Sequence, residues 1–443
     1  MRILVLCPHF EPDVAPTGVV MTSIVEQLAA RGNRLHVVSA LPWYLSHRVE
    51  PGWTGRLVRH EEVAWGRVTR VHPFPTDKRN IPARAMAFGG FTAVAAAAAA
   101  ASPRRPDVVL AMSPPLTLGP AGRIVASRFG VPFVFNIQDV FPDVAVEVGA
   151  ITSPLVIAAA ARLERATYRS ADAVTVLSED LRANVAAKLD PRDATPHPAS
   201  SWSRITRSTA TDPAKVRVIP NFVDTEAIRP GPKENAYRRE HGLEGRTVVM
   251  YAGNLGYSQS VELLLDAAVA FEHDPDVVFV INGGGSARPG LERRARGLAN
   301  VRFVDLQPRE RLPEVLAAAD VHVVALRRGL GRSSVPSKTY SILAAGRPIV
   351  ASVDPGTEVA RIVELAGAGI AVPPEDAEAF VKAVRRTVEH PADAESWGRA
   401  GRDFVARWAS PAAVAQQYEA LFGELVGLPS RGPQRAGRYR PRR

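Results

Sequence analysis

Short apolar segments alternate with helical stretches along most of this chain, and the alternation restricts the fold more than any other feature. Segments expected to form strands lie at residues 3–7, 35–39, 108–112, 133–136 and 174–177, and a second series lies at 247–252, 277–282, 301–304, 321–326 and 349–352. Strands separated by helices form a parallel sheet covered on both faces. Because 443 residues also exceed what one core usually supports, the sequence predicts an α/β protein with two doubly wound domains.

The domain boundary is expected near residue 224, where the segment 218–226 precedes the Pro/Gly-rich stretch 230–232. We therefore expect a first domain at 1–224, a second domain at 225–410, a C-terminal helix at 411–428 and a disordered tail at 429–443. Residues 190–213 are rich in proline, serine, threonine and alanine, which indicates a flexible insertion in the first domain.

The apolar segments do not predict a membrane span or a secretory signal. The longest apolar run, 88–101, is shorter than the roughly 20 residues that a spanning helix needs. The first residues read as a strand that soon meets Pro8 and Glu11, so a cytoplasmic location is expected. The single cysteine, Cys7, excludes an intramolecular disulfide and is expected to be a small core residue.

The basic character of the chain is concentrated at its end. The net charge is +10, and residues 429–443 contain six arginines and no acidic residue, so that the charge without them falls to +4. Such a tail is attracted to an anionic membrane surface by about 1 kcal/mol per charge, and it would equally serve as a solubilising segment. Nucleic acid is not an expected partner, because no zinc-finger, RNP or basic-zipper pattern occurs.

Residues 333–352 predict a phosphate-binding site. Ser337 is expected to cap a short helix that begins at Lys338, and Gly346 is expected to end it before the next strand. Free N–H groups and a lysine at a helix start favour a phosphate, although an ordinary loop with a solvated lysine would have the same sequence. The preceding loop adds Arg327, Arg328 and Arg332, and this cluster of cations favours a diphosphate ligand.

Each half of the chain opens with a strand, a turn and a helix. In the first half the turn contains His9 and leads to Gly18, and in the second half it contains Gly253 and Gly256. Glycines in such turns let a ligand approach the backbone. Gly284 lies in a similar position after another strand, where a simple tight turn is the alternative. No G-x-G-x-x-G and no Walker pattern occurs, which argues against a dehydrogenase and against an NTPase.

Together these motifs resemble the GT-B family 4 glycosyltransferases, and most closely the WbuB-like branch of surface-polysaccharide assembly. The resemblance covers nearly all of residues 1–428 and rests on the segments 219–224, 253–256, 282–285, 336–338 and 344–349. It implies a GT-B fold of two Rossmann-like domains facing a central cleft, with the acceptor mainly in the first domain and the donor in the second. It also implies retaining transfer from a nucleotide-diphosphate sugar, without a cofactor or a divalent metal.

The resemblance further implies which residues bind each substrate. The donor-side residues are Gly253, Asn254, Gly256, Gly284, Leu306, Gln307, Arg327, Arg328, Arg332, Ser337, Lys338 and Glu358. The acceptor-side residues are His9, Gly18, Gln138 and Asp139, and the expected catalytic residues are Asp139, Lys338 and Glu358. A turn cap is the alternative role for Asp139, and a helix-start glutamate is the alternative for Glu358.

The chain departs from many relatives at three places. Two family glutamates fall on Ser333 and Ser341, which cannot act as carboxylates, and a family histidine falls on Gln138. A basic pair falls on Asn254 and Gln259, and the arginine loop is expected to replace its charge.

We therefore predict a retaining hexosyltransferase that acts on a glycan or polyprenyl-linked acceptor, cytoplasmic or peripheral at the inner face of the membrane. Electrostatic stabilisation of the leaving diphosphate is expected to dominate catalysis. A non-hydrolysing sugar-nucleotide 2-epimerase and a catalytically silent sugar-nucleotide-binding protein stay open as alternatives. A third is a peripheral-membrane interaction module built from the tail and the alanine-rich helix, which would not need two intact domains.

Overall fold

The computed structural model contains two α/β units. Unit 1 comprises Met1–Pro220 together with Val414–Arg443, and unit 2 comprises Asn221–Ala413. The residues that the structure describes are 1–44, 47–76, 81–143, 146, 151–189, 212–256, 258–330 and 336–428. The chain passes into unit 2 at Asn221, close to the expected boundary, and most of the expected C-terminal helix belongs to unit 1. The tail and nearly all of the expected insertion lie outside the described residues.

The sheet of unit 1 has the strand order β3-β4-β2-β1-β5-β6-β7-β8. Its strands are β1 (Arg2–Leu6), β2 (Arg34–Ala40), β3 (Val58–Val63), β4 (Gly66–Val71), β5 (Val108–Ser113), β6 (Phe133–Ile137), β7 (Ala173–Val176) and β8 (Val216–Val218). Neighbouring strands are parallel except β3 and β4. Strands β1, β5 and β6 are almost wholly buried, as apolar strands covered on both faces should be.

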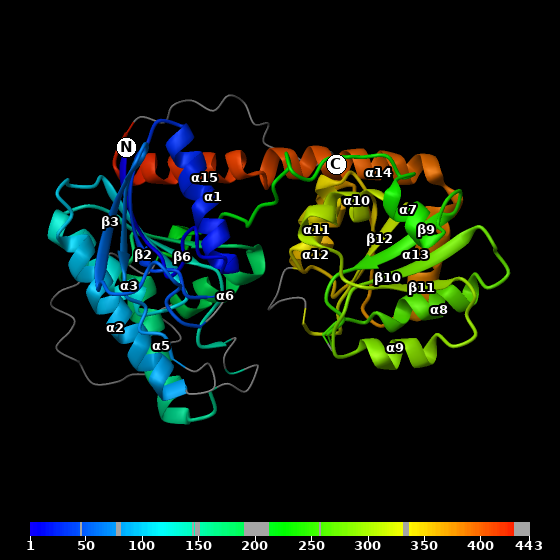
Figure 1. Cartoon of the computed structure of the whole chain (residues 1–443), viewed down its shortest axis with the longest axis horizontal. Helices are drawn as coiled ribbons and strands as arrows, with labels where there is room; N and C mark the ends of the chain where they lie inside the picture. Colours follow the sequence, from blue (N-terminus) through cyan, green and yellow to red (C-terminus); the bar gives the residue numbers. More distant parts are fainter. Residues whose placement is uncertain are drawn as a thin grey trace. The chain divides into compact units, whose positions relative to one another are not determined.

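Helices cover the sheet of unit 1. They are α1 (Pro16–Ala30), α2 (Ile81–Ala100), α3 (Leu118–Phe129), α5 (Pro154–Ser170), α6 (Glu179–Leu189) and α15 (Pro411–Leu425), and a 3-10 turn, η3 (Pro213–Lys215), precedes β8. Helix α3 packs against both α2 and α5. Helix α15 lies beside α1 (Figure 1), where Arg31 forms an ion pair of 2.6 Å with Glu419. The last helix that the structure describes is therefore largely part of the first α/β unit.

The sheet of unit 2 is entirely parallel and has the order β11-β10-β9-β12-β13-β14. Its strands are β9 (Thr247–Ala252), β10 (Val277–Asn282), β11 (Val301–Val304), β12 (Val321–Ala325), β13 (Ile349–Ser352) and β14 (Gly369–Val372). Alternate residues of β9 enter different cores, with Val249 and Tyr251 in one and Val248 and Met250 in another. The sheet is thus covered on both faces, as predicted.

The helices of unit 2 are α7 (Ala236–His241), α8 (Glu262–Ala270), α9 (Arg288–Arg294), α10 (Leu312–Ala317), α11 (Lys338–Ala344), α12 (Glu358–Ala366), α13 (Ala377–Glu389) and α14 (Pro391–Trp408), with a 3-10 turn, η4 (Arg309–Arg311), before α10. Helix α8 packs on α13, and α11 and α12 pack on α14. Figure 1 shows α8 and α9 beneath the sheet and α10, α11 and α12 at its other side.

Four strands were absent from the prediction, and three of them, β3, β4 and β8, lack the apolar run that marks a buried strand. Strand β3 reads Val-Arg-His-Glu-Glu-Val, is half exposed and lies at the sheet edge. Its partner β4 carries two arginines, β8 has only three residues, and β14 is a partly exposed edge strand. Within the described residues, no helix combines the length and apolarity required to cross a bilayer.

Candidate functional site

The strand order of unit 2 identifies where a ligand is expected. The chain runs from β9 to β10 and β11 on one side, and then continues with β12, β13 and β14 on the other side of β9. In open α/β sheets, ligands bind at the carboxyl ends of the strands where the order reverses. The turn 253–256 follows β9 there, and Lys338 begins the helix that follows β12.

The side chain of Lys338 brings a buried positive charge to this position. Its Nζ lies 3.8 Å from the centroid of the Tyr251 ring. A Cβ placed on Gly253 would lie 3.0 Å from the same Nζ, so the ammonium group adjoins the glycine turn. Part of the residue reaches solvent, but Nζ itself is buried without a hydrogen-bond partner. This burial lowers the pKa of Lys338 to about 7.

Tyr251 connects this lysine to the turn. Its hydroxyl donates to the carbonyl oxygen of Asn254 at 2.7 Å, and Oε1 of Gln259 lies 3.1 Å from the same hydroxyl oxygen. Burial raises the pKa of Tyr251, so the phenol stays neutral. Asn254 and Gln259 are the two positions on which the resemblance places a basic pair, and neither side chain is charged. The cation that the structure describes beside the turn is Lys338 of α11.

The two glycine-rich loops pack closely. The backbone N–H of Gly253 donates to the Asn282 carbonyl at 2.9 Å, and Leu255 N–H donates to the Gly284 carbonyl at 2.8 Å. A Cβ at Gly283 would lie 1.9 Å from the Gly253 carbonyl oxygen, which no side chain could tolerate. The site around Gly284 is open, and a Cβ at Gly256 would meet the Asn254 amide at 3.0 Å.

The arginines of the β12–α11 loop are not equivalent. Arg327 is engaged by two carboxylates, Glu262 at 2.7 Å and Glu375 at 3.1 Å. The side chain of Arg328 is 69% exposed, donates to the Pro374 carbonyl at 3.2 Å and lies 4.0 Å from Glu375. Arg332 and Ser333 lie outside the described residues. Because Arg327 has two close carboxylates, whereas Arg328 has one at a longer distance and is more exposed, Arg328 is the better candidate of these two for a ligand.

The other donor-side predictions are placed as follows. Ser337 stands at the N-cap position of α11, as predicted, but it has a helical backbone conformation and its hydroxyl makes no capping bond. Glu358 is 4% exposed and pairs with Arg361 at 3.0 Å, at the start of α12. Leu306 is 70% exposed, and Gln307 accepts a bond from Arg311 at 3.2 Å. Their roles stay predictions.

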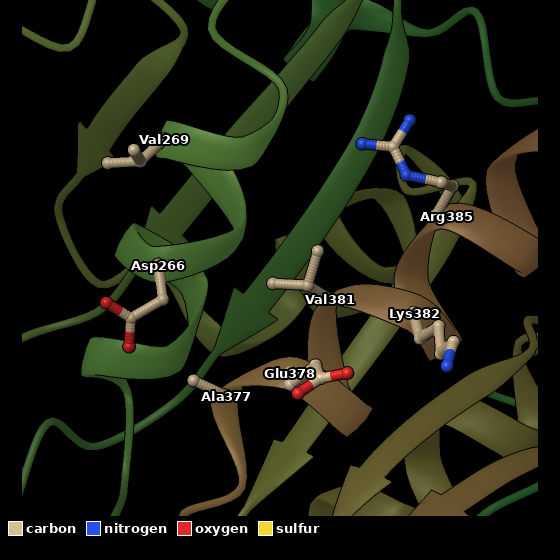
Figure 2. A pocket seen from close by; sticks show the side chains of 7 residues that line it. All are labelled: Asp266, Val269, Ala377, Glu378, Val381, Lys382 and Arg385. Atoms are coloured by element: carbon tan, nitrogen blue, oxygen red, sulfur yellow. The ribbon is translucent and has the colours of Figure 1, made fainter.

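A hollow of about 440 Å³ also occurs in unit 2, between α8 and α13 (Figure 2). It is lined by Asp266, Val269, Ala377, Glu378, Val381, Lys382 and Arg385. Asp266 already pairs with Arg294, and the Arg385 guanidinium lies 4.6 Å from the Phe271 ring. Both helices cover a face of the sheet. None of the predicted donor-side residues lines this hollow.

In unit 1, two of the predicted acceptor-side residues, His9 and Gly18, lie against each other. A Cβ on Gly18 would lie 2.9 Å from the Cβ of His9, so glycine is required for their approach. The His9 Nδ1 lies 2.7 Å from Oδ2 of Asp13, a residue that the sequence did not indicate.

Gln138 follows β6 and belongs to a buried network of amides and hydroxyls. Its Nε2 donates to Asn136 Oδ1 at 2.8 Å, and Asn136 Nδ2 donates to the Tyr418 hydroxyl at 2.8 Å and to Thr175 Oγ1 at 3.0 Å. Helix α15 thus fixes the amide orientation of Gln138. The neighbouring Asp139 is exposed, and partial desolvation raises the pKa of its carboxyl.

The sequence did not indicate three residues of these sites, Tyr251, Tyr418 and Asp13, whose side chains contact other segments of the chain. Tyr251 reads as an ordinary buried strand residue, and Tyr418 lies in a helix far along the chain from Asn136. Asp13 stands in a proline-rich loop without periodicity. Only the histidine four residues before Asp13 offered a signal for the pair.

Comparisons with known proteins give matches over both units. The family model described as "Glycosyl transferases group 1" matches residues 246–390, and "Glycosyl transferase 4-like domain" matches residues 17–199. WcaI of Escherichia coli K12, named as a colanic acid biosynthesis glycosyl transferase, is 27% identical over 88% of this chain and 92% of its own length. WbjE of Pseudomonas aeruginosa, named as a glycosyltransferase, is 27% identical over 65% of this chain and 67% of its own.

A solved structure shows the same fold. HepE from Anabaena, in a complex with UDP-glucose, superposes with a TM-score of 0.60 and 15% identity over 96% of this chain and all of that one. The two family matches cover most of both units, and the sheets have the topology of Rossmann-like domains. The chain belongs to the GT-B glycosyltransferases of family 4, as its motifs predicted, and it is a transferase.

Proposed function

We propose that unit 2 binds a nucleotide-diphosphate sugar with its diphosphate at Lys338. The observation that carries this proposal is the Nζ of Lys338, which is buried beside the Gly253 turn without a hydrogen-bond partner. Removing an ammonium group from water without a partner is costly, and an anionic ligand would supply the missing partner. The UDP-glucose complex of HepE supports a ligand of this class.

The chain then transfers the sugar to a glycan or lipid-linked acceptor in surface-polysaccharide synthesis. The name of WcaI supports this pathway. Lys338 stabilises the charge that develops on the leaving diphosphate, in the role that electrostatic groups commonly have in such reactions. Transfer retains the anomeric configuration, and the leaving phosphate takes the acceptor proton, so that Gln138 need not act as a base. No divalent metal is required, because Lys338 provides the counter-charge. We place the enzyme at the cytoplasmic face of the membrane.

The test combines binding and turnover. UDP, GDP and ADP are first screened by thermal shift, where a ligand at 100 times its Kd stabilises by about 2.7 kcal/mol. The corresponding sugar nucleotides are then incubated with the enzyme in EDTA, and released nucleoside diphosphate and the anomeric configuration of the product are measured. We expect release and a retained product. Binding without release would indicate a silent binding protein, and an isomerised sugar nucleotide would indicate an epimerase.

A further inference from the structure

Three helices of unit 1, α2, α3 and α5, pack on the same side of its sheet (Figure 1). Phe91 of α2, Val125 of α3 and Tyr168 of α5 enter one core, and α3 contacts both other helices. Each helix follows a strand, β4, β5 or β6, and these strands run parallel. The first turns of the three helices therefore lie at the same edge of the sheet.

Large apolar side chains are exposed in these first turns. Met86 of α2 is 73% exposed, Ile124 of α3 is 65% exposed, and Leu155 and Val156 of α5 are 84% and 49% exposed. All four lie within about the first two turns of their helices. The outer side of a surface helix is normally polar, and a group of exposed apolar side chains marks an interaction surface. We call these four side chains the apolar edge.

The same three helices are strongly basic. Their sequences contain six arginines and one acidic residue, Glu164. Glu164 is buried and pairs with Lys188 at 2.7 Å, so it adds no negative charge to the surface. Arg162 and Arg169 of α5 are exposed, and within the described residues no carboxylate pairs with either. The surface beside the apolar edge therefore carries uncompensated positive charge.

Along α5 the exposed residues change from apolar to basic. Leu155, Ala159, Arg162, Ala166 and Arg169 are all exposed, and their spacing of three or four residues places them on one stripe of the helix. Apolar side chains at one end of such a stripe can enter the boundary of a bilayer, while the arginines behind them reach the lipid phosphates.

We propose that the apolar edge docks on an anionic lipid bilayer, with the exposed arginines of α5 against the headgroups. A protein partner could also cover apolar side chains, but uncompensated arginines beside them complement an anionic surface. The inference rests on the proposed function in its lipid-linked acceptor, and it adds the surface that brings unit 1 to that acceptor. It does not involve the basic tail.

The first test changes the apolar edge without changing charge. The double variant Leu155→Gln, Val156→Gln should bind at least about tenfold more weakly to vesicles of equal parts phosphatidylglycerol and phosphatidylcholine, since burial of one leucine side chain contributes about that factor. Leu365→Gln, at an exposed leucine of α12 in unit 2, is the matched control and should bind like the wild type. These side chains are largely exposed, so the variants should fold normally.

The second test changes the charge. Arg162→Gln with Arg169→Gln removes two exposed arginines of α5, and Arg293→Gln with Arg296→Gln removes two exposed arginines at the end of α9. The first pair should weaken vesicle binding about 10–30-fold. The second pair should weaken it less than about twofold, because charges more than a Debye length of about 8 Å from the lipid are screened. Equal effects of the two pairs would overturn the inference.

A fluorophore identifies the surface that contacts lipid. Cys7 is buried, so Leu155→Cys can be labelled selectively with an environment-sensitive dye, and Leu365→Cys serves as its control. Vesicles should shift the emission to shorter wavelength only for Leu155→Cys. No shift there, or wild-type binding by the Leu155→Gln, Val156→Gln protein, would overturn the inference. A shift that follows protein concentration without lipid would also overturn it, since a second copy would then cover the edge.

Nucleoside diphosphate binding separates this inference from the proposed function. The thermal shift by the nucleoside diphosphate should be the same in all these variants as in the wild type, because none of the substituted residues lies beside Lys338. Loss of vesicle binding with a normal thermal shift supports the docking surface. Absence of nucleoside diphosphate binding in the wild type would instead refute the proposed function.

Discussion

Replacing Lys338 by methionine should raise stability and weaken ligand binding at the same time. Burial lowers the pKa of Lys338 from 10.5 to about 7, and at 1.36 kcal/mol per unit this corresponds to a desolvation cost of about 4–5 kcal/mol for the charged form. Contact with the Tyr251 ring offsets up to about 2 kcal/mol of that cost. Methionine has a similar length and no charge, so Lys338→Met should gain at least about 1 kcal/mol at pH 7, or about 2–4 °C in Tm.

The pH dependence has a definite sign. The pKa is lower in the folded than in the unfolded chain, so the unfolded chain binds more protons between pH 7 and 10.5, and the penalty on the wild type disappears as the pH rises through that range. The Tm advantage of Lys338→Met should therefore be largest below pH 7 and vanish near pH 10.5.

The same variant should bind the nucleoside diphosphate about 10–100 times more weakly, because a charge-assisted bond of about 1.5–3 kcal/mol is lost. Differential scanning calorimetry and a thermal-shift titration measure the two effects. Lys382→Met, an exposed lysine of α13, is the control and should alter neither. A Lys338→Met protein that is less stable at every pH and binds normally would refute the reasoning.

Three further predictions address the remaining residues. Asp139→Asn should lower kcat at least several-fold while donor Kd stays constant; a normal kcat would leave Asp139 as a turn residue. Arg328→Ala should raise the Kd for nucleoside diphosphate severalfold, whereas Arg327→Ala, which breaks partly exposed ion pairs with Glu262 and Glu375, should change stability by about 0–1 kcal/mol and binding little; equal effects of the two would contradict this distinction. Deleting residues 430–443 should reduce salt-sensitive co-sedimentation with anionic vesicles and spare activity on a soluble acceptor; unchanged sedimentation at low salt would make the segment a solubilising one.

The sequence predicted the buried strands well because a strand covered on both faces is an apolar run. The bounds of β9, β10, β11 and β13 agree with their apolar segments to the residue. Strand β3 was missed because an edge position lets it carry Arg59, Glu61 and Glu62. Buried strands can therefore be located from their apolar runs alone. The position of an edge strand such as β3 depends on the strand with which it pairs.

The candidate site was predictable in its position but not in its electrostatics. Lys338 was placed at the start of a helix after a buried strand, and the structure agrees. That its Nζ rests on the Tyr251 ring, and that Arg327 is paired with glutamates, depends on contacts between segments far apart in sequence. For the same reason the partner of His9 could not be assigned before the loop conformation was known.

Proton uptake on binding tests the role of Lys338 most directly. With a pKa of about 7 the free lysine is only about one-tenth protonated at pH 8, and an adjacent diphosphate should restore its charge. Isothermal titration calorimetry with the nucleoside diphosphate at pH 8, in two buffers of different ionisation enthalpy, should show uptake of somewhat less than one proton in the wild type and clearly less in Lys338→Met. Equal uptake by the two proteins would contradict the assignment of Lys338 as the diphosphate-binding group.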